Sequence, residues 1–113
     1  MQTQIENLLE KIKTDYINWS TSNGTKEIGS YTQGVLDAFD DNVEVKHCKK
    51  YIKIVGGVSS GVWGFIVATD DHPKFKKGDI LKAAGYNAPA MNAARGNVFE
   101  DYTIRWTGPL YLN

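Results

Sequence analysis

The sequence predicts an α+β fold, with an N-terminal amphipathic helix followed by a small antiparallel sheet of about four strands. Apolar residues recur at helical spacing over residues 4–19, and β-branched and aromatic residues fill segments 43–55 and 62–69. After residue 70, Gly, Ala, Asn and Pro become frequent, which predicts loops and short helical turns near the C-terminus. The 113 residues predict one domain, with an anchoring helix over 1–22 and the sheet and a ligand loop over 43–112.

A single apolar stripe predicts the N-terminal helix, and its members are Ile5, Leu8, Leu9, Ile12, Tyr16 and Trp19. Thr3, with Glu6 three residues later, has the pattern of a capping box and is the predicted N-cap. Residues 20–24 supply turn chemistry that ends the helix. The stripe must pack on the protein's own sheet or on a second subunit. The sequence of the next segment, 25–42, is compatible with either a short helix or a loop edge.

The strands are predicted from composition and from the turns between them. Residues 43–55 predict one or two strands, and the glycine-rich segment 56–61 predicts a turn that joins them to the strand at 62–69 in a hairpin. A short strand is expected to begin at Ile80 and Leu81. The segment 83–97 predicts a short helix or a structured loop, and residues 102–106 predict an edge strand.

Charge and cysteine content restrict the class of protein. Thirteen basic and thirteen acidic side chains give zero net charge, so we expect no general nucleic-acid binding. The single cysteine, Cys48, excludes an internal disulfide and predicts a reducing, cytosolic setting. The N-terminal residues are polar and mixed in charge, and no apolar run has the length of a membrane span, so we expect no signal peptide and no membrane association.

No residue is predicted to be catalytic, and no metal or cofactor is expected. His47 and Cys48 are adjacent on a predicted strand, where neighbours point to opposite faces and cannot readily form a nucleophile–base pair. Two histidines and one cysteine do not make a spaced set of metal ligands. The acidic cluster Asp37, Asp40 and Asp41 is interpreted as a solvated surface. A small hydrolase is therefore the weakest of the functional hypotheses.

The segment 83–97 carries the residues best suited to bind a small anionic ligand. Its small side chains allow close approach of the backbone, Tyr86 offers a ring for stacking on a base, and Arg95 offers a planar fork for phosphate. Amide side chains that both donate and accept hydrogen bonds follow in Asn87, Asn92 and Asn97. The predicted ligand-binding set is Tyr86, Arg95, Asn97, Asn92, Lys82, Phe65 and Arg105.

Structural interpretations of the same residues remain open. The small residues are also typical of tight packing, and Arg95 is also suited to a structural salt bridge. Trp63 and Phe65, which share a strand face, are more typical of a core or a subunit interface than of a pocket.

Three short stretches resemble a group of small phage-encoded proteins. They are GDILK at residues 78–82, APA at 88–90 and ARGN at 94–97, within a region of resemblance from Phe65 to Phe99. The best match is the first-described type of Thoeris anti-defence protein. Where that group has Lys-Pro-Ala-Ser-Trp, this chain has KAAGY at 82–86, and its segment 90–95 is one residue longer.

The resemblance implies a phage protein that acts in the cytoplasm of the infected bacterial host. Proteins of that type sequester cyclic ADP-ribose isomers without degrading them, and some hold cyclic oligonucleotides at a separate site of a larger oligomer. By this resemblance Tyr86 stacks on adenine, while Arg95 and Asn97 make phosphate and polar contacts. We also expect a homo-oligomer, a dimer or a higher assembly such as a hexamer, because a small alanine-rich domain gains stability by burying surface between copies.

A protein-interaction module that inhibits a host protein is the alternative function. The exposed face expected for the N-terminal helix and the aromatic residues of the predicted hairpin favour this hypothesis.

Overall fold

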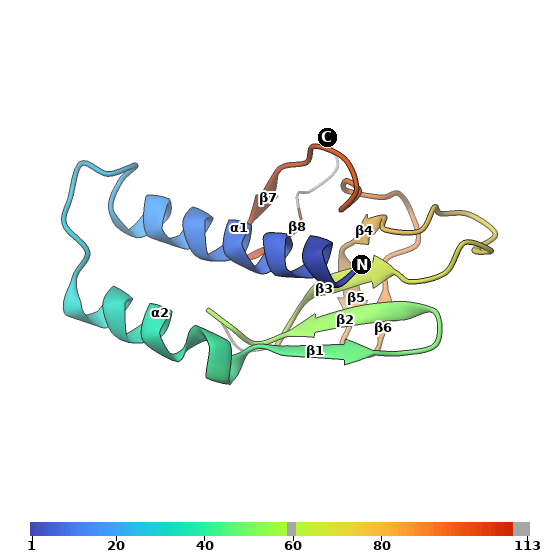
Figure 1. Ribbon diagram of the computed structural model, residues 1–113, viewed down its shortest axis with the longest axis horizontal. Helices are drawn as coiled ribbons and strands as arrows, with labels where there is room; N and C mark the ends of the chain where they lie inside the picture. Colours follow the sequence, from blue (N-terminus) through green and yellow to red (C-terminus); the bar gives the residue numbers. More distant parts are fainter. Residues whose placement is uncertain (59–60, 110–113) are drawn as a thin grey trace.

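The computed structural model describes residues 1–58 and 61–109, and it confirms the predicted α+β class (Figure 1). Two helices, α1 (Gln2–Ser20) and α2 (Ser30–Asn42), precede an antiparallel four-stranded sheet with the order β1-β2-β3-β4. Its strands are β1 (Glu44–His47), β2 (Tyr51–Val55), β3 (Val62–Val67) and β4 (Ile80–Leu81). Residues 110–112 of the predicted sheet and loop region (43–112) and residues 59–60 of the predicted turn at 56–61 lie outside the described residues.

The ends of α1 differ: its N-terminus has no side-chain cap, whereas its C-terminus has side-chain hydrogen bonds. α1 begins one residue before the predicted cap: Met1 is the N-cap, with no side-chain capping bond, so the prediction of Thr3 was wrong. At the other end, the Thr21 hydroxyl donates to the Ile17 carbonyl at 2.7 Å and accepts from the Gly24 N–H at 3.1 Å. The segment that the sequence left open forms α2, whose one fully buried side chain is Phe39.

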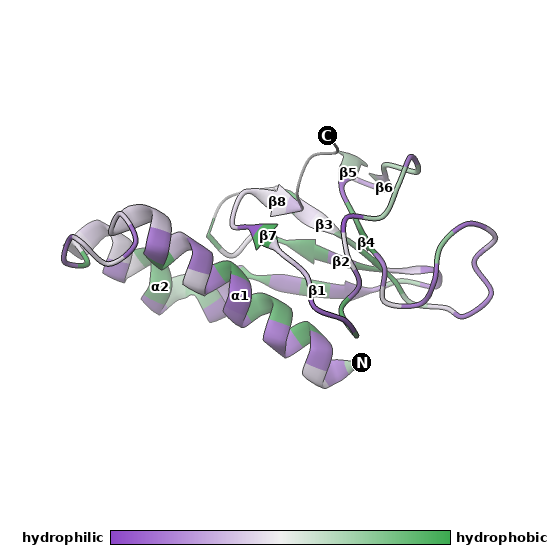
Figure 2. Cartoon of the chain, turned by 90° about the horizontal axis from the view of Figure 1, so that it is seen from above, coloured by the Kyte–Doolittle hydropathy of each residue, from purple (hydrophilic) through white to green (hydrophobic). Residues whose placement is uncertain are grey.

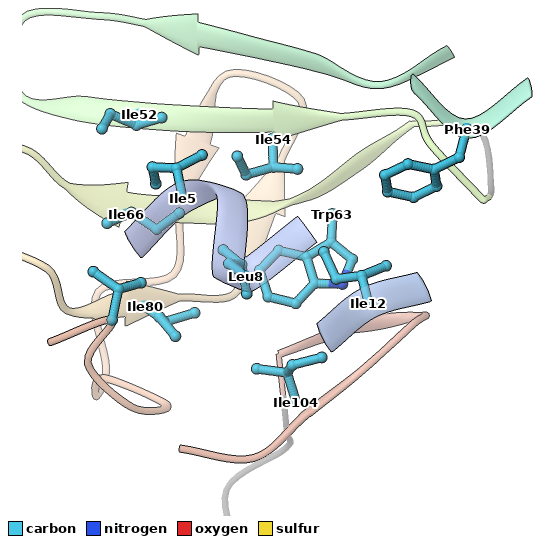
Figure 3. Packing of buried hydrophobic residues seen from close by; sticks show 11 residues of the cluster. Ile5, Leu8, Ile12, Phe39, Ile52, Ile54, Trp63, Ile66, Ile80 and Ile104 are labelled. Atoms are coloured by element: carbon cyan, nitrogen blue, oxygen red, sulfur yellow. The ribbon is translucent and has the colours of Figure 1, made fainter. Parts of the chain in front are cut away.

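The first core lies between α1 and one face of the sheet (Figure 3). Ile5, Leu8 and Ile12 of the helix pack on an apolar layer formed by Ile52, Ile54, Trp63, Ile66 and Ile80. Successive side chains of a strand point to opposite faces of the sheet, so Ile52 and Ile54, two residues apart, share this face. The helix therefore buries its stripe on its own sheet, which leaves Trp19 at its end 64% exposed.

A second, smaller core lies on the opposite face of the sheet. Phe65, Val67 and Leu81 are buried there together with Phe75 from the loop after β3. Trp63 packs in the first core instead, so the prediction that Trp63 and Phe65 share a strand face was wrong: the β2–β3 register shifts at Ile54 and Val55, and this shift leaves Trp63 without a partner on β2. In Figure 2, α1 and the small hairpin β5 (Ala83–Gly85) with β6 (Ala88–Pro89) lie on opposite sides of the sheet. Lys53 of β2 is the register partner of Phe65, so it shares this second face.

The C-terminal third corrects two predictions. For the segment 83–97, predicted to be a short helix or a structured loop, the helix is wrong: residues 83–89 form the β5–β6 hairpin and the remainder is loop. The segment 102–106 was predicted to be an edge strand, but only β7 (Ile104–Arg105) is a strand, and it pairs with β8 (Gly108–Pro109) in a separate hairpin. No helix within residues 1–58 and 61–109 has the length and apolar character needed to cross a membrane.

Candidate functional site

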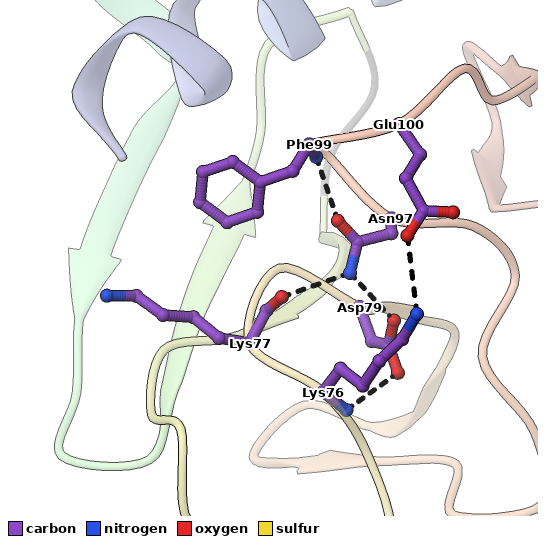
Figure 4. A network of polar contacts seen from close by, with 6 residues as sticks. All are labelled: Lys76, Lys77, Asp79, Asn97, Phe99 and Glu100. Carbon is purple, nitrogen blue, oxygen red and sulfur yellow. Dashed lines mark hydrogen bonds and ion pairs between the residues drawn. The ribbon is translucent and has the colours of Figure 1, made fainter.

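Asn97, a predicted ligand residue, is buried and uses its amide within the protein (Figure 4). Its Nδ2 donates to Asp79 Oδ1 at 2.9 Å and to the Lys77 carbonyl at 3.0 Å. Its Oδ1 accepts from the Phe99 N–H at 2.8 Å. A ligand that bound this amide would have to replace bonds that already satisfy it, so we leave Asn97 out of the proposed contact set.

The backbone around Asn97 pairs with the strand that precedes the ligand loop. The N–H of Ile80 donates to the Gly96 carbonyl at 2.8 Å, and the N–H of Arg95 donates to the Ile80 carbonyl at 2.7 Å. The Val98 N–H donates to the Gly78 carbonyl at 2.9 Å. Residues 95–98 therefore occupy the edge of the sheet beside β4.

Gly78 is required at this junction by both conformation and space. Its φ of +90° lies in the region that favours glycine, and a Cβ there would lie 2.6 Å from a ring carbon of Phe99. We call Gly78, Asp79, Gly96, Asn97 and Phe99 the clasp. The motif pairs Gly78-Asp79 and Gly96-Asn97 therefore have structural roles in this chain.

Arg95 and Asn92, both predicted ligand residues, lie together on the loop before the clasp. Arg95 is half-buried, and its guanidinium donates to Asn92 Oδ1 at 3.1 Å and to the Ala93 carbonyl at 3.2 Å. Lys82 is half-buried too, and its backbone carbonyl accepts from Ala90 at 2.6 Å. The loop is therefore shaped by internal contacts of the residues that the sequence nominated.

Tyr86, at the turn between β5 and β6, lies against a lysine that the sequence analysis missed. Lys53 Nζ lies 3.4 Å from the centroid of the Tyr86 ring and donates to Asn87 Oδ1 at 3.1 Å. Lys53 is 6% exposed, whereas Tyr86 is 55% exposed. We call Lys53, Tyr86 and Asn87 the Lys53 site. The signal available in the sequence is a lysine between Ile52 and Ile54 in the middle of a strand.

No carboxylate among residues 1–58 and 61–109 forms an ion pair with Lys53. Lys46, its register partner on β1, forms an ion pair with Glu44 at 3.5 Å. Further ion pairs join Lys13 to Glu10 and Asp40, and Lys76 to Glu100, and none of these pairs includes Lys53. Burying an ammonium is costly, and a neutral amide oxygen and a ring compensate it in part. This site is therefore suited to attract an anion.

The two remaining predicted residues lie elsewhere. Phe65 is buried in the second core at 3% exposure, which favours the interpretation of this residue as a core residue. Arg105 lines a hollow of about 430 Å³ at the end of α1, together with Trp19, Trp106 and Asp15. The structure therefore brings Arg95 and Asn92 together and places Tyr86 beside Lys53. Arg105 belongs to the hollow at the end of α1 instead.

His72 holds the loop that covers the second core. Its Nδ1 accepts from the N–H groups of Lys74 and Phe75, each at 3.1 Å. Because Nδ1 is the acceptor, Nε2 carries the proton of the neutral ring and donates to the Tyr51 hydroxyl at 2.9 Å. These contacts make His72 a structural residue of this face.

Comparisons with known proteins identified no relative of this chain. The chain matches no protein-family model, no curated protein and no solved structure. Among the residues that the structure describes, no group of three or more His, Cys, Asp or Glu side chains is arranged to hold a metal ion.

Proposed function

We propose that this protein is a non-catalytic phage anti-defence protein that sequesters a nucleotide-derived immune signal. The proposed ligand is a cyclic ADP-ribose isomer, and cyclic oligonucleotides are the second class of ligand proposed for the same function. The observation that carries the proposal is the largely exposed ring of Tyr86 beside the buried ammonium of Lys53. The homo-oligomeric state and the host cytoplasm belong to the same proposal.

The chemistry of the Lys53 site suits the two parts of such a ligand. Stacking of a base on an aromatic side chain contributes about 1–3 kcal/mol in nucleic-acid-binding proteins. A buried ammonium interacts with phosphate more strongly than an exposed one, because less water screens it. Asn92 and Arg95, further along the loop, add polar groups of the kind that ribose and phosphate need.

Sequestration also fits the kinds of group that the site contains. It requires affinity and slow release, whereas turnover requires a nucleophile or bound water activated by a positioned base. The contacts of Lys53 are an amide oxygen and an aromatic ring, which orient the ammonium without acting as a base.

Calorimetry with a panel of cyclic nucleotides and cyclic ADP-ribose isomers tests the proposal. We expect one panel member to bind and to be released chemically unaltered by heat, as judged by mass spectrometry. Tyr86→Ala should weaken its binding about tenfold through loss of stacking. Tyr31→Ala is the matched control, because Tyr31 is 80% exposed on α2 and should leave affinity unchanged. Absence of binding across the panel, or recovery of hydrolysed ligand, contradicts the proposal.

A protein-interaction module is the second candidate, and one observation favours it. Trp19, 64% exposed, is held in place by Trp106 and Tyr16, with ring centroids 5.0 Å and 6.0 Å away. A rigid, exposed indole is the kind of side chain that dominates binding energy at protein interfaces. Under this alternative, Trp19→Ala abolishes capture of a host protein from lysate, and Arg95→Ala leaves the biological activity intact.

A further inference from the structure

The turn between β5 and β6 covers the one described lysine that is almost wholly buried. Asn87 Oδ1 accepts a hydrogen bond from Lys53 Nζ at 3.1 Å, and the Tyr86 ring lies over the same ammonium at 3.4 Å. Both groups occupy positions that the oxygen atoms of an anion would take around an ammonium. The protein therefore supplies, from its own chain, neutral substitutes for an anionic partner.

We propose that Lys53 is the anion-binding group of this protein and that the Tyr86–Asn87 turn is a plug which a phosphoryl group displaces. The ligand class is a compound with one or more phosphates, whether free or attached to a nucleoside. The nucleoside part of this inference rests on the proposed function, whereas the anion site stands on the contacts of Lys53 alone.

Electrostatics favour the exchange of the plug for a phosphate. An ammonium forms shorter and stronger hydrogen bonds with an ionised oxygen than with a neutral amide. The adjacent Lys46 is already paired with Glu44, whereas the contacts of Lys53 are a neutral amide oxygen and an aromatic ring. An arriving phosphate therefore forms a bond in which donor and acceptor are both charged, in place of one in which only the ammonium is charged.

The plug belongs to a weakly held element, so its displacement is feasible. β5 and β6 pair through Ala83 with Pro89 and Gly85 with Ala88, and the register shifts between these pairs. Residues 84–88 are exposed and mostly small, so their displacement uncovers little apolar surface. In contrast, residues 95–98 are fixed to β4 by backbone bonds, which anchor the far end of the loop.

If the Tyr86–Asn87 turn is a plug, removal of its side chains should increase the affinity for pyrophosphate. Asn87→Ala removes a competitor for Lys53, so it should tighten the binding of inorganic pyrophosphate about fivefold. Tyr86→Ala should also tighten pyrophosphate binding, yet it should weaken a nucleotide ligand, because the base loses its stacking partner. A site in which Asn87 and Tyr86 simply contact the phosphate predicts weaker pyrophosphate binding for both variants.

Titration of inorganic pyrophosphate into the full chain tests the inference, with affinity measured by calorimetry and the Asn87 side-chain amide followed by NMR. We expect the Asn87 amide resonances to shift on binding and Asn87→Ala to bind more tightly. Lys53→Met should lose at least tenfold in affinity, and Lys46→Met should change it less than threefold. Folding of each variant is checked by its unfolding transition, and Asn87→Ala provides the test even if Lys53→Met fails to fold, because Asn87 is exposed.

Two results overturn the inference: equal pyrophosphate affinity in Lys53→Met and the unmodified protein, or weaker pyrophosphate binding in Asn87→Ala. A second titration with cyclic ADP-ribose isomers separates this inference from the proposed function. Pyrophosphate binding through Lys53 without binding of any cyclic nucleotide keeps the anion site and removes the proposed function. Cyclic nucleotide binding that is insensitive to Lys53→Met keeps the proposed function and removes the anion site.

Discussion

Buried polar side chains have different kinds of bonding partner in the clasp and in the Lys53 site. At the clasp, the buried side chains of Asn97 and Asp79 bond to each other and to nearby backbone. At the Lys53 site, a buried ammonium has neutral partners from an exposed turn. Both are polar, and both involve the segment 78–99 that the sequence singled out. The difference shows that the partners of a polar side chain, more than its type, separate a structural residue from a candidate binding residue.

This difference has consequences for stability. A satisfied buried network stabilises the fold, and removal of one member leaves the others unpaired. A buried charge without a counter-charge lowers stability, and such a residue is typical of a site where function is retained at the expense of stability. Substitutions in the clasp and at the Lys53 site should therefore change stability in different directions.

Asn97→Ala is expected to have the largest effect on stability. It removes three hydrogen bonds and leaves the Asp79 carboxylate buried with fewer donors, so the free energy of unfolding should fall by about 3 kcal/mol. Asn92→Ala, in an exposed position, should change it by less than about 0.5 kcal/mol. Denaturant unfolding measures both, and equal stability of the two variants would show that the clasp is not a structural unit.

Gly78→Ala should have the next largest effect. A Cβ at this position adopts a φ of +90° and lies too close to Phe99, so we expect a loss of about 2 kcal/mol. Gly34→Ala is the matched control, since nothing lies within 4 Å of a Cβ at that position in α2. There alanine should stabilise the helix by about 0.5–1 kcal/mol, because glycine is a poor helix former. The comparison fails if both variants shift the thermal midpoint in the same direction.

Tyr102, which packs against Gly96 of the clasp, should show the smallest effect. Its hydroxyl is buried with no hydrogen-bond partner among the described residues, and burial raises the pKa of Tyr102 above its usual value near 10. The neutral form is thus favoured in the fold, so this contribution to stability is complete below about pH 10 and is lost as pH rises through the raised pKa.

Tyr102→Phe removes the unpartnered hydroxyl and its titration. We expect unfolding free energy at pH 7 to be unchanged or higher by up to about 1 kcal/mol. Above pH 10, the variant should lose less stability than the unmodified protein. Unfolding measured across pH 7–11 checks this, and a steeper alkaline loss in the variant would mean that the hydroxyl has a stabilising partner.

The sequence predicted regular elements better than it predicted the site. Helical spacing of Ile5, Leu8 and Ile12 was sufficient for α1, and the β-branched and aromatic composition of segments 43–55 and 62–69 was sufficient for β2 and β3. The cap at Thr3 failed because the Met1 carbonyl accepts the Ile5 N–H at 3.0 Å and starts the helix earlier. The edge strand at 102–106 failed because residues 95–98 already occupy the edge beside β4.

The site depended on burial, which local pattern does not reveal. A lysine within a strand is normally assigned to the solvent face, and Lys53 is buried because the hairpin after β4 folds back over that face. Likewise, an asparagine in a loop is equally compatible with ligand contact and with a structural bond. Asn97 is structural because Asp79 and Phe99 meet it across the turn.

One crossed measurement tests the central distinction most directly: unfolding free energy and affinity for the same cyclic nucleotide or pyrophosphate, each determined for Asn97→Ala and Lys53→Met. We predict that Asn97→Ala loses stability but, at a temperature where it is fully folded, binds within about threefold of the unmodified protein. Lys53→Met should keep or gain stability and lose at least about tenfold in affinity. A folded Asn97→Ala protein that no longer binds, beside a Lys53→Met protein that binds normally, would contradict the assignment of both regions.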